Sequence, residues 1–120
     1  MSTSPTVLYL RFKLRVPPDD LFGHCRQAAE KIASTEGVIW KIWLAQQEQR
    51  EMGGAYLFAD RQAALHYLNH PIVQAVCTNP AVMSVDSQLW DVDESLSAIT
   101  RGPLQDLRME EPVVTMAGGR

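Results

Sequence analysis

The sequence is poor in cysteine, in clustered positive charge and in long apolar runs. Two cysteines, Cys25 and Cys77, are too few for a disulfide framework and favour a reduced intracellular setting. A formal net charge of -3 without a basic cluster argues against nucleic acid or an anionic membrane as the main partner. No apolar run reaches the roughly 20 residues of a membrane-spanning helix, and the first residues lack a signal-peptide pattern. We therefore expect a cytoplasmic protein that binds neither membrane nor nucleic acid.

Recognisable catalytic signatures are also missing. The chain has no Gly-x-Ser-x-Gly motif, no phosphate-cradling glycine loop and no dinucleotide fingerprint. His66 and His70 have the spacing at which two histidines on a helix share a metal, but Pro71 interrupts that helix and no motif supplies a third ligand. Cys25 falls on an apolar helical face, where a thiol behaves as a small hydrophobic group. The residues thus predict neither a metal nor a bound cofactor.

The chain does contain the alternating patterns of one small α+β domain. Strand patterns cover residues 6–14, 38–45, 52–58 and 82–92, and helical spacing covers 21–34 and 60–68, with a further turn over 72–76. The order strand, helix, strand, strand, helix, strand predicts a ferredoxin-like fold, in which a four-stranded antiparallel sheet carries both helices on one face. We assign this domain to residues 1–100 and expect residues 101–120 to form an extended or partly disordered arm.

Two local features refine this plan. Asp60 has the position of a helix N-cap. Gly53 and Gly54 lie inside a strand, where glycine is costly, and predict either a bulge or a close approach of a ligand or neighbouring backbone.

The strand after Gly37 is apolar on both faces. Strict alternation along it points Trp40 toward the helices and places Trp43 on the opposite face of the sheet. That opposite face would then be too apolar for a monomer in water, so we expect a second copy of the chain to cover it, sheet against sheet. The residues expected in this homodimer interface are Tyr9, Ile39, Lys41, Trp43 and Leu57.

Aromatic side chains are expected to gather between the sheet and the helices. They are Phe12, Phe22, Trp40, Tyr56, Phe58 and Tyr67. An apolar space with a few polar tips suits a planar aromatic or quinol-like ligand, although an ordinary packed core explains the same residues. A histidine titrates near neutral pH and is the natural base beside such a ligand, so the candidates are His24, His66 and His70.

Three segments together resemble the YdhR-type putative monooxygenase family of the dimeric α/β-barrel superfamily. They are Glu36-Gly-Val-Ile-Trp-Lys-Ile-Trp43, Gly53-Gly-Ala-Tyr-Leu-Phe58 and Trp90-Asp-Val-Asp-Glu-Ser-Leu-Ser97, and the likeness covers residues 6–100. The resemblance implies a homodimer whose two sheets face each other. It also implies an oxygenase that works without metal, haem or flavin, because a deprotonated, electron-rich substrate itself reduces dioxygen.

Two other functions fit the same expected pocket. A polyketide-type cyclase or isomerase would abstract a proton next to a carbonyl and would turn over without oxygen. A non-catalytic protein would hold an aromatic ligand or merely dimerise. Oxygen dependence separates the first function from the oxygenase, and ligand binding without turnover is typical of the second.

Overall fold

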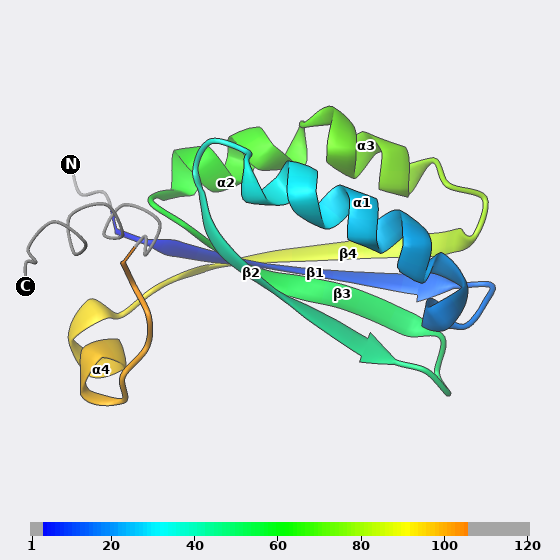
Figure 1. Cartoon of the computed structure of the whole chain (residues 1–120). Coiled ribbons are helices and arrows are strands. Elements are labelled where there is room, and N and C mark those ends of the chain that lie inside the picture. Colours follow the sequence, from blue (N-terminus) through cyan, green and yellow to red (C-terminus); the bar gives the residue numbers. More distant parts are fainter. Residues whose placement is uncertain (1–3, 106–120) are drawn as a thin grey trace, which may run out of the picture.

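A computed structural model describes residues 4–105 of the chain (Figure 1). Its strands are β1 (Thr6–Leu14), β2 (Val38–Gln46), β3 (Glu51–Phe58) and β4 (Val82–Asp91). Its helices are the 3-10 turn η1 (Pro18–Leu21), α1 (Phe22–Ala33), α2 (Arg61–Leu68), α3 (Pro71–Cys77) and α4 (Glu94–Ile99). Among these residues no helix is long and apolar enough to cross a membrane.

The strands form one antiparallel sheet in the order β2-β3-β1-β4. Helices α1, α2 and α3 cover one face of it, and α4 lies on the other side near the start of β1 (Figure 1). The ferredoxin-like α+β fold expected from the sequence is therefore confirmed, with strand and helix bounds close to those predicted. The Asp60 cap is also confirmed, because its Oδ1 accepts a hydrogen bond of 2.8 Å from the Ala63 amide.

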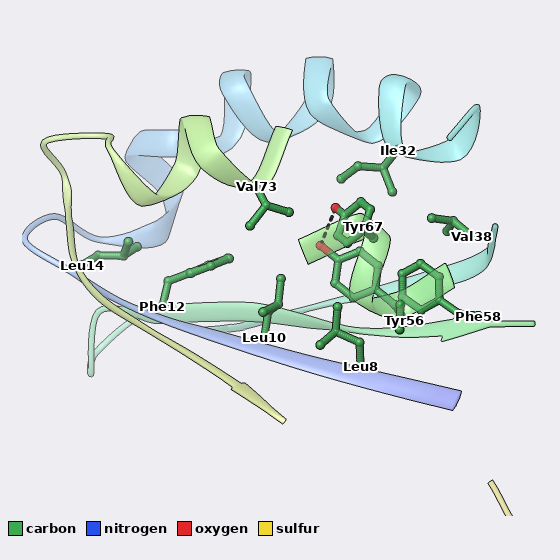
Figure 2. Close-up of a cluster of buried hydrophobic side chains, with 11 residues drawn as sticks. Leu8, Leu10, Phe12, Leu14, Ile32, Val38, Tyr56, Phe58, Tyr67 and Val73 are labelled. Atoms are coloured by element: carbon green, nitrogen blue, oxygen red, sulfur yellow. Dashed lines mark hydrogen bonds between the residues drawn. The ribbon is translucent and has the colours of Figure 1, made fainter. Parts of the chain in front are cut away.

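The core lies between the sheet and helices α1 to α3. Alternation along β1 points one row of side chains into it, and β3 and α2 add a cluster of aromatic rings (Figure 2). The members of this hydrophobic cluster that come from these three elements are Leu8, Leu10, Phe12, Leu14, Tyr56, Phe58, Ala64 and Tyr67. The rings of Tyr56, Phe58 and Tyr67 pack with centroids 4.9 to 5.9 Å apart, a range typical of favourable aromatic contacts.

A bulge in β2 overturns the predicted facing of that strand. Val38 pairs with Phe58, but Trp40 pairs with Leu57, so Ile39 is an extra residue that shifts the alternation by one. Residues paired directly across strands share a face, and the shift therefore reverses every side chain that follows it.

Three predicted positions are corrected by this shift. Trp40 lies opposite Leu57 on the face away from the helices, and not among the residues packed under them. Lys41 lies opposite Tyr56 and Trp43 opposite Gly54, so both are on the helix-covered face and not in the expected dimer interface. Strict alternation failed because it assumes that no residue is inserted in the ladder.

The glycine pair in β3 allows two close approaches. The register runs through both positions without interruption, so they are not a bulge. A Cβ on Gly53 would collide with the carbonyl oxygen of Leu10 on the neighbouring strand. A Cβ on Gly54 would lie 2.5 Å from Cε of Lys41, whose side chain runs across this position. The predicted close approach of neighbouring backbone is therefore confirmed at Gly53, whereas the nearest group at Gly54 is a side chain, which was not predicted.

The chain itself covers one end of the outer sheet face. Helix α4 was not predicted; the Asp93 carboxylate caps it by accepting from the Leu96 amide at 3.0 Å. Beyond α4 the chain returns to β2, where the indole N–H of Trp40 donates to the carbonyl oxygen of Pro103 at 2.8 Å. Leu57, beside Trp40, is fully buried. Of the predicted arm at 101–120, residues 106–120 lie outside the described residues.

The rest of the outer face is open. Exposed apolar side chains there include Ile42 at 52%, Leu44 at 41% and Trp90 at 60% of their possible surface. The corner of the outer face at the start of β3 is polar, because the Glu51 carboxylate pairs with two basic side chains. Its oxygens lie 3.6 Å from Nε of Arg11 and 3.5 Å from Nζ of Lys13.

Candidate functional site

A cavity of about 240 Å³ lies between the sheet and helices α1 and α3. Its floor comes from alternate residues of β1 and β3, and its roof comes from the inner side of the two helices. The walls are largely apolar, and the residues that supply them include Leu10, Phe12, Leu14, Ile32, Met52, Ile72, Val73 and Val76. Of the residues that the structure describes, no Asp or Glu lines the cavity. Its shape and composition are those of a site for a small, mostly apolar molecule.

Lys41 is less exposed than Lys31 and His24, the other basic residues that line the cavity. Its Nζ lies 3.3 Å from the ring centroid of Trp43 and 4.6 Å from that of Tyr56, so two aromatic faces contact the amine. The aliphatic stem lies across Gly54, which has no side chain to occupy that space. None of the ion pairs among the described residues involves Lys41.

A pair of tyrosines closes the inner end of the cavity. The hydroxyl of Tyr67 on α2 donates to the hydroxyl oxygen of Tyr56 on β3 at 3.1 Å, as the dashed line in Figure 2 marks. Both residues are buried and both line the cavity. The pair therefore presents polar oxygen atoms within an otherwise apolar wall.

Burial shifts the pKa values of four side chains in this region, Lys41, Cys25, Tyr56 and Tyr67, toward their neutral forms. Removal from water lowers the pKa of Lys41 to about 7, and the nearby Cys25 opposes the shift only in part. Burial likewise raises the pKa of the Cys25 thiol, with Lys41 opposing the change. Burial also raises the pKa of Tyr56 and of Tyr67, so both phenols stay protonated at neutral pH.

The structure brings together part of the predicted aromatic set. Phe12, Tyr56 and Tyr67 line the cavity. Phe58 is fully buried in the adjoining core but is not among the lining residues. Phe22 is 63% exposed and borders a separate hollow between α1 and β2.

The three candidate histidines occupy different places. His24 on α1 is at the exposed rim of the cavity. His66 is exposed on α2 and does not line it. His70 caps α3, because its Nδ1 accepts a hydrogen bond of 3.1 Å from the Ile72 amide, and its ring stacks on Tyr67. Within residues 4–105 no group of three or more His, Cys, Asp or Glu side chains is placed to hold a metal ion.

Sequence reasoning missed Lys41 and Trp43 as cavity residues. The missing information was the position of the bulge, since each side chain would point outward in an uninterrupted strand. One signal was available in the sequence: Gly54 marks a point of close approach on the neighbouring strand, and a long side chain opposite or beside it is a natural occupant.

Several solved structures share this fold. SnoaB, a cofactor-independent oxygenase from Streptomyces nogalater, superposes with a TM-score of 0.60 and 14% sequence identity over 74% of this chain and 93% of its own. A putative antibiotic biosynthesis monooxygenase from Caulobacter crescentus has a TM-score of 0.58 and 13% identity over 75% and 91% of the two chains. A dabb family protein with a ferredoxin-like fold from Mesorhizobium loti has a TM-score of 0.57 and 20% identity over 74% and 97%. At such identities the likeness establishes the fold.

Sequence comparison identifies the family. Comparison with curated proteins found no match. The family model described as "Putative mono-oxygenase ydhR" matches residues 7–103, which run from the second residue of β1 to beyond α4. The resemblance seen in the sequence motifs is confirmed, and the chain belongs to the YdhR family of putative mono-oxygenases.

Proposed function

We propose that this protein is a cofactor-independent monooxygenase that acts on an aromatic or quinol-like small molecule bound between the sheet and helices α1 and α3. The observation that carries the proposal is the cavity of about 240 Å³, with its apolar walls and the hydroxyl pair of Tyr56 and Tyr67. Membership of the YdhR family and the shared fold with SnoaB support the reaction type.

The reaction needs a substrate that can act as its own reductant. After losing a proton, an electron-rich ring system passes an electron to dioxygen. One oxygen atom then enters the substrate, and the other leaves as water with two hydrogens of the substrate. The apolar walls exclude water from the reactive intermediates. Tyr56 and Tyr67 donate or accept hydrogen bonds that orient the substrate oxygen, and His24 at the rim is the histidine positioned to exchange protons with solvent.

Oxygen uptake during incubation with a panel of hydroquinones tests the proposal. We expect product to form aerobically and not anaerobically, and we expect Tyr56→Phe and His24→Gln to slow turnover. His66→Gln is the matched control, because His66 is exposed and outside the cavity lining. Turnover that is equal with and without oxygen would instead support a cyclase or isomerase.

We also propose that two copies of the chain pair through the outer face of the sheet. The support is the exposed apolar surface of Ile42, Leu44 and Trp90 on the face that helices α1 to α3 leave open. Ile42→Glu is expected to produce a monomer in analytical ultracentrifugation, since a charge would be buried without a partner. Leu65→Glu is the control, because Leu65 has a similar exposure of 41% but lies on α2. Unchanged sedimentation of the Ile42 variant would contradict this pairing.

A cytoplasmic setting is part of the same proposal. Both cysteines, Cys25 and Cys77, are free thiols in the structure. Free thiols persist where the compartment is reducing.

A further inference from the structure

We propose that Lys41 takes the acidic proton of a phenol or enol bound in the cavity and then holds the resulting oxyanion as its counter-ion. The inference rests on the cavity of the proposed function and adds to it a substrate class and a residue. The cavity would thus select flat apolar molecules that carry an acidic hydroxyl over molecules of the same shape that lack one.

Within residues 4–105, no acidic side chain of the cavity wall pairs with Lys41. The other titratable side chains that line the cavity are His24, Cys25 and Lys31 on α1, Tyr56 on β3 and Tyr67 on α2. Two of these are basic, and burial keeps the thiol and both phenols in their neutral forms. Among the described residues no Asp or Glu lines the cavity, so the two aromatic faces offset part of the desolvation cost of an ammonium there, and a bound anion would offset more of it.

The position of Lys41 is set by its neighbours. The ring of Trp43 lies against the amine at 3.3 Å, and the ring of Tyr56 lies at 4.6 Å. The stem crosses Gly54, where a Cβ would come within 2.5 Å of Cε. The amine is therefore presented at the cavity wall against the rings of Trp43 and Tyr56.

The proton passes directly from the ligand to Lys41, so the donor and the acceptor are both in the site. The neutral amine of Lys41 accepts the hydroxyl proton of the ligand, and the products are an ammonium and an oxyanion in contact. The lowered pKa of about 7 means that a substantial fraction of Lys41 is neutral at neutral pH and can accept this proton. The transfer itself requires no oxidant or other reactant.

Binding of 4-nitrophenol provides a direct test, because its phenol and phenolate forms absorb at different wavelengths. We expect the wild-type protein to lower the pKa of the bound dye by about one unit or more, as a cation at close range does for an acid. In Lys41→Met the same apolar cavity lacks the cation, so burial should raise the pKa of the bound dye above that of the free dye. The predicted result is a reversal in the direction of the shift.

Further variants separate charge from structure. Methionine is unbranched and can follow the same path across Gly54, and a urea titration shows whether the variant is folded. Lys41→Arg keeps the cation and should keep the lowered dye pKa. Lys13→Met removes a lysine from the polar corner of the outer face, where it pairs with Glu51, and should leave the dye titration unchanged. 4-Nitroanisole, which has no acidic proton, should bind wild type and Lys41→Met alike.

The outcomes are decisive in both directions. A dye pKa that shifts the same way in wild type and Lys41→Met overturns the inference, as does the absence of dye binding to the wild type. The oxygen-uptake assay is independent of this measurement. Reversal of the dye shift without oxygen uptake on any hydroquinone would leave the role of Lys41 standing and refute the monooxygenase function.

Discussion

Replacing each of two adjacent glycines by alanine should have very different effects on the free energy of unfolding. Gly53 and Gly54 occupy consecutive positions of β3, so their local sequence context is the same. A Cβ on Gly53 would collide with the carbonyl oxygen of Leu10 and would lie 3.1 Å from Cα of Arg11, and both obstacles are backbone atoms of the central strand β1. Relief would require the ladder between β1 and β3 to move.

The obstacle at Gly54 is of another kind. There the closest atom is Cε of Lys41 at 2.5 Å, the far end of a flexible side chain, and the nearest backbone atom is the carbonyl oxygen of Ile42 at 3.1 Å. The lysine can change rotamer, and the backbone has to yield only by a few tenths of an ångström. Alanine also reduces the conformational freedom of the unfolded chain, which stabilises by about 0.4 to 1 kcal/mol.

We therefore expect Gly53→Ala to lower the free energy of unfolding by about 3 kcal/mol or more, at the upper end of overpacking effects. Gly54→Ala should change it by less than about 1 kcal/mol, because the two contributions oppose each other. Urea denaturation at one protein concentration measures both, with the midpoint compared at equal slope. Equal losses in the two variants, or a larger loss in Gly54→Ala, would refute the assignment of the two close approaches.

Three further outcomes are expected from the structure. Tyr67→Phe should lower the free energy of unfolding by about 1 to 3 kcal/mol, because it removes the donor to the buried hydroxyl of Tyr56. The double variant with Tyr56→Phe and Tyr67→Phe should lose less than the sum of the two single losses, and urea titrations of the wild type and the three variants measure this coupling. Asp60→Ala should cost about 1 kcal/mol through loss of the α2 cap, and thermal unfolding would show no change if the cap contributed nothing. Because the pKa of Lys41 is lowered to about 7, the free energy of unfolding should rise between pH 7 and the ordinary lysine pKa, by at most about 1.4 kcal/mol per pH unit. In that range the unfolded chain still binds the proton that the folded chain has lost. Urea titrations at pH 7 and about pH 9 measure the rise, which Lys41→Met should remove. An equal change in the free energy of unfolding between the two pH values in both proteins would contradict the burial of the amine.

Much of the architecture was predictable because it depends on local patterns. Alternation along residues 6–14 is satisfied only by a strand, and Asp60 begins a helix because its side chain can accept from an amide three residues later. The order of these elements leaves few arrangements other than a ferredoxin-like sheet. Helix α4 was missed although Asp93 carries the same cap signal, because its few apolar residues do not form a periodic stripe.

The candidate site was predicted only in part. Phe12, Tyr56 and Tyr67 were placed correctly because they lie in regular elements whose alternation is intact. Trp40, Lys41 and Trp43 were not, because they follow the inserted residue Ile39. The insertion depends on how β2 pairs with β3, and no residue type in β2 indicates where it occurs.

The sequence by itself determined the family, the order of the elements and the rows of side chains that fill the core, since each depends on spacing within a few residues of chain. Only the tertiary structure decided which face of β2 meets the helices. A single extra residue in the ladder turned Lys41 inward, across Gly54 and against two aromatic rings. The buried amine of the cavity is therefore placed by strand pairing, because the pairing partner, and not the local sequence, sets the register.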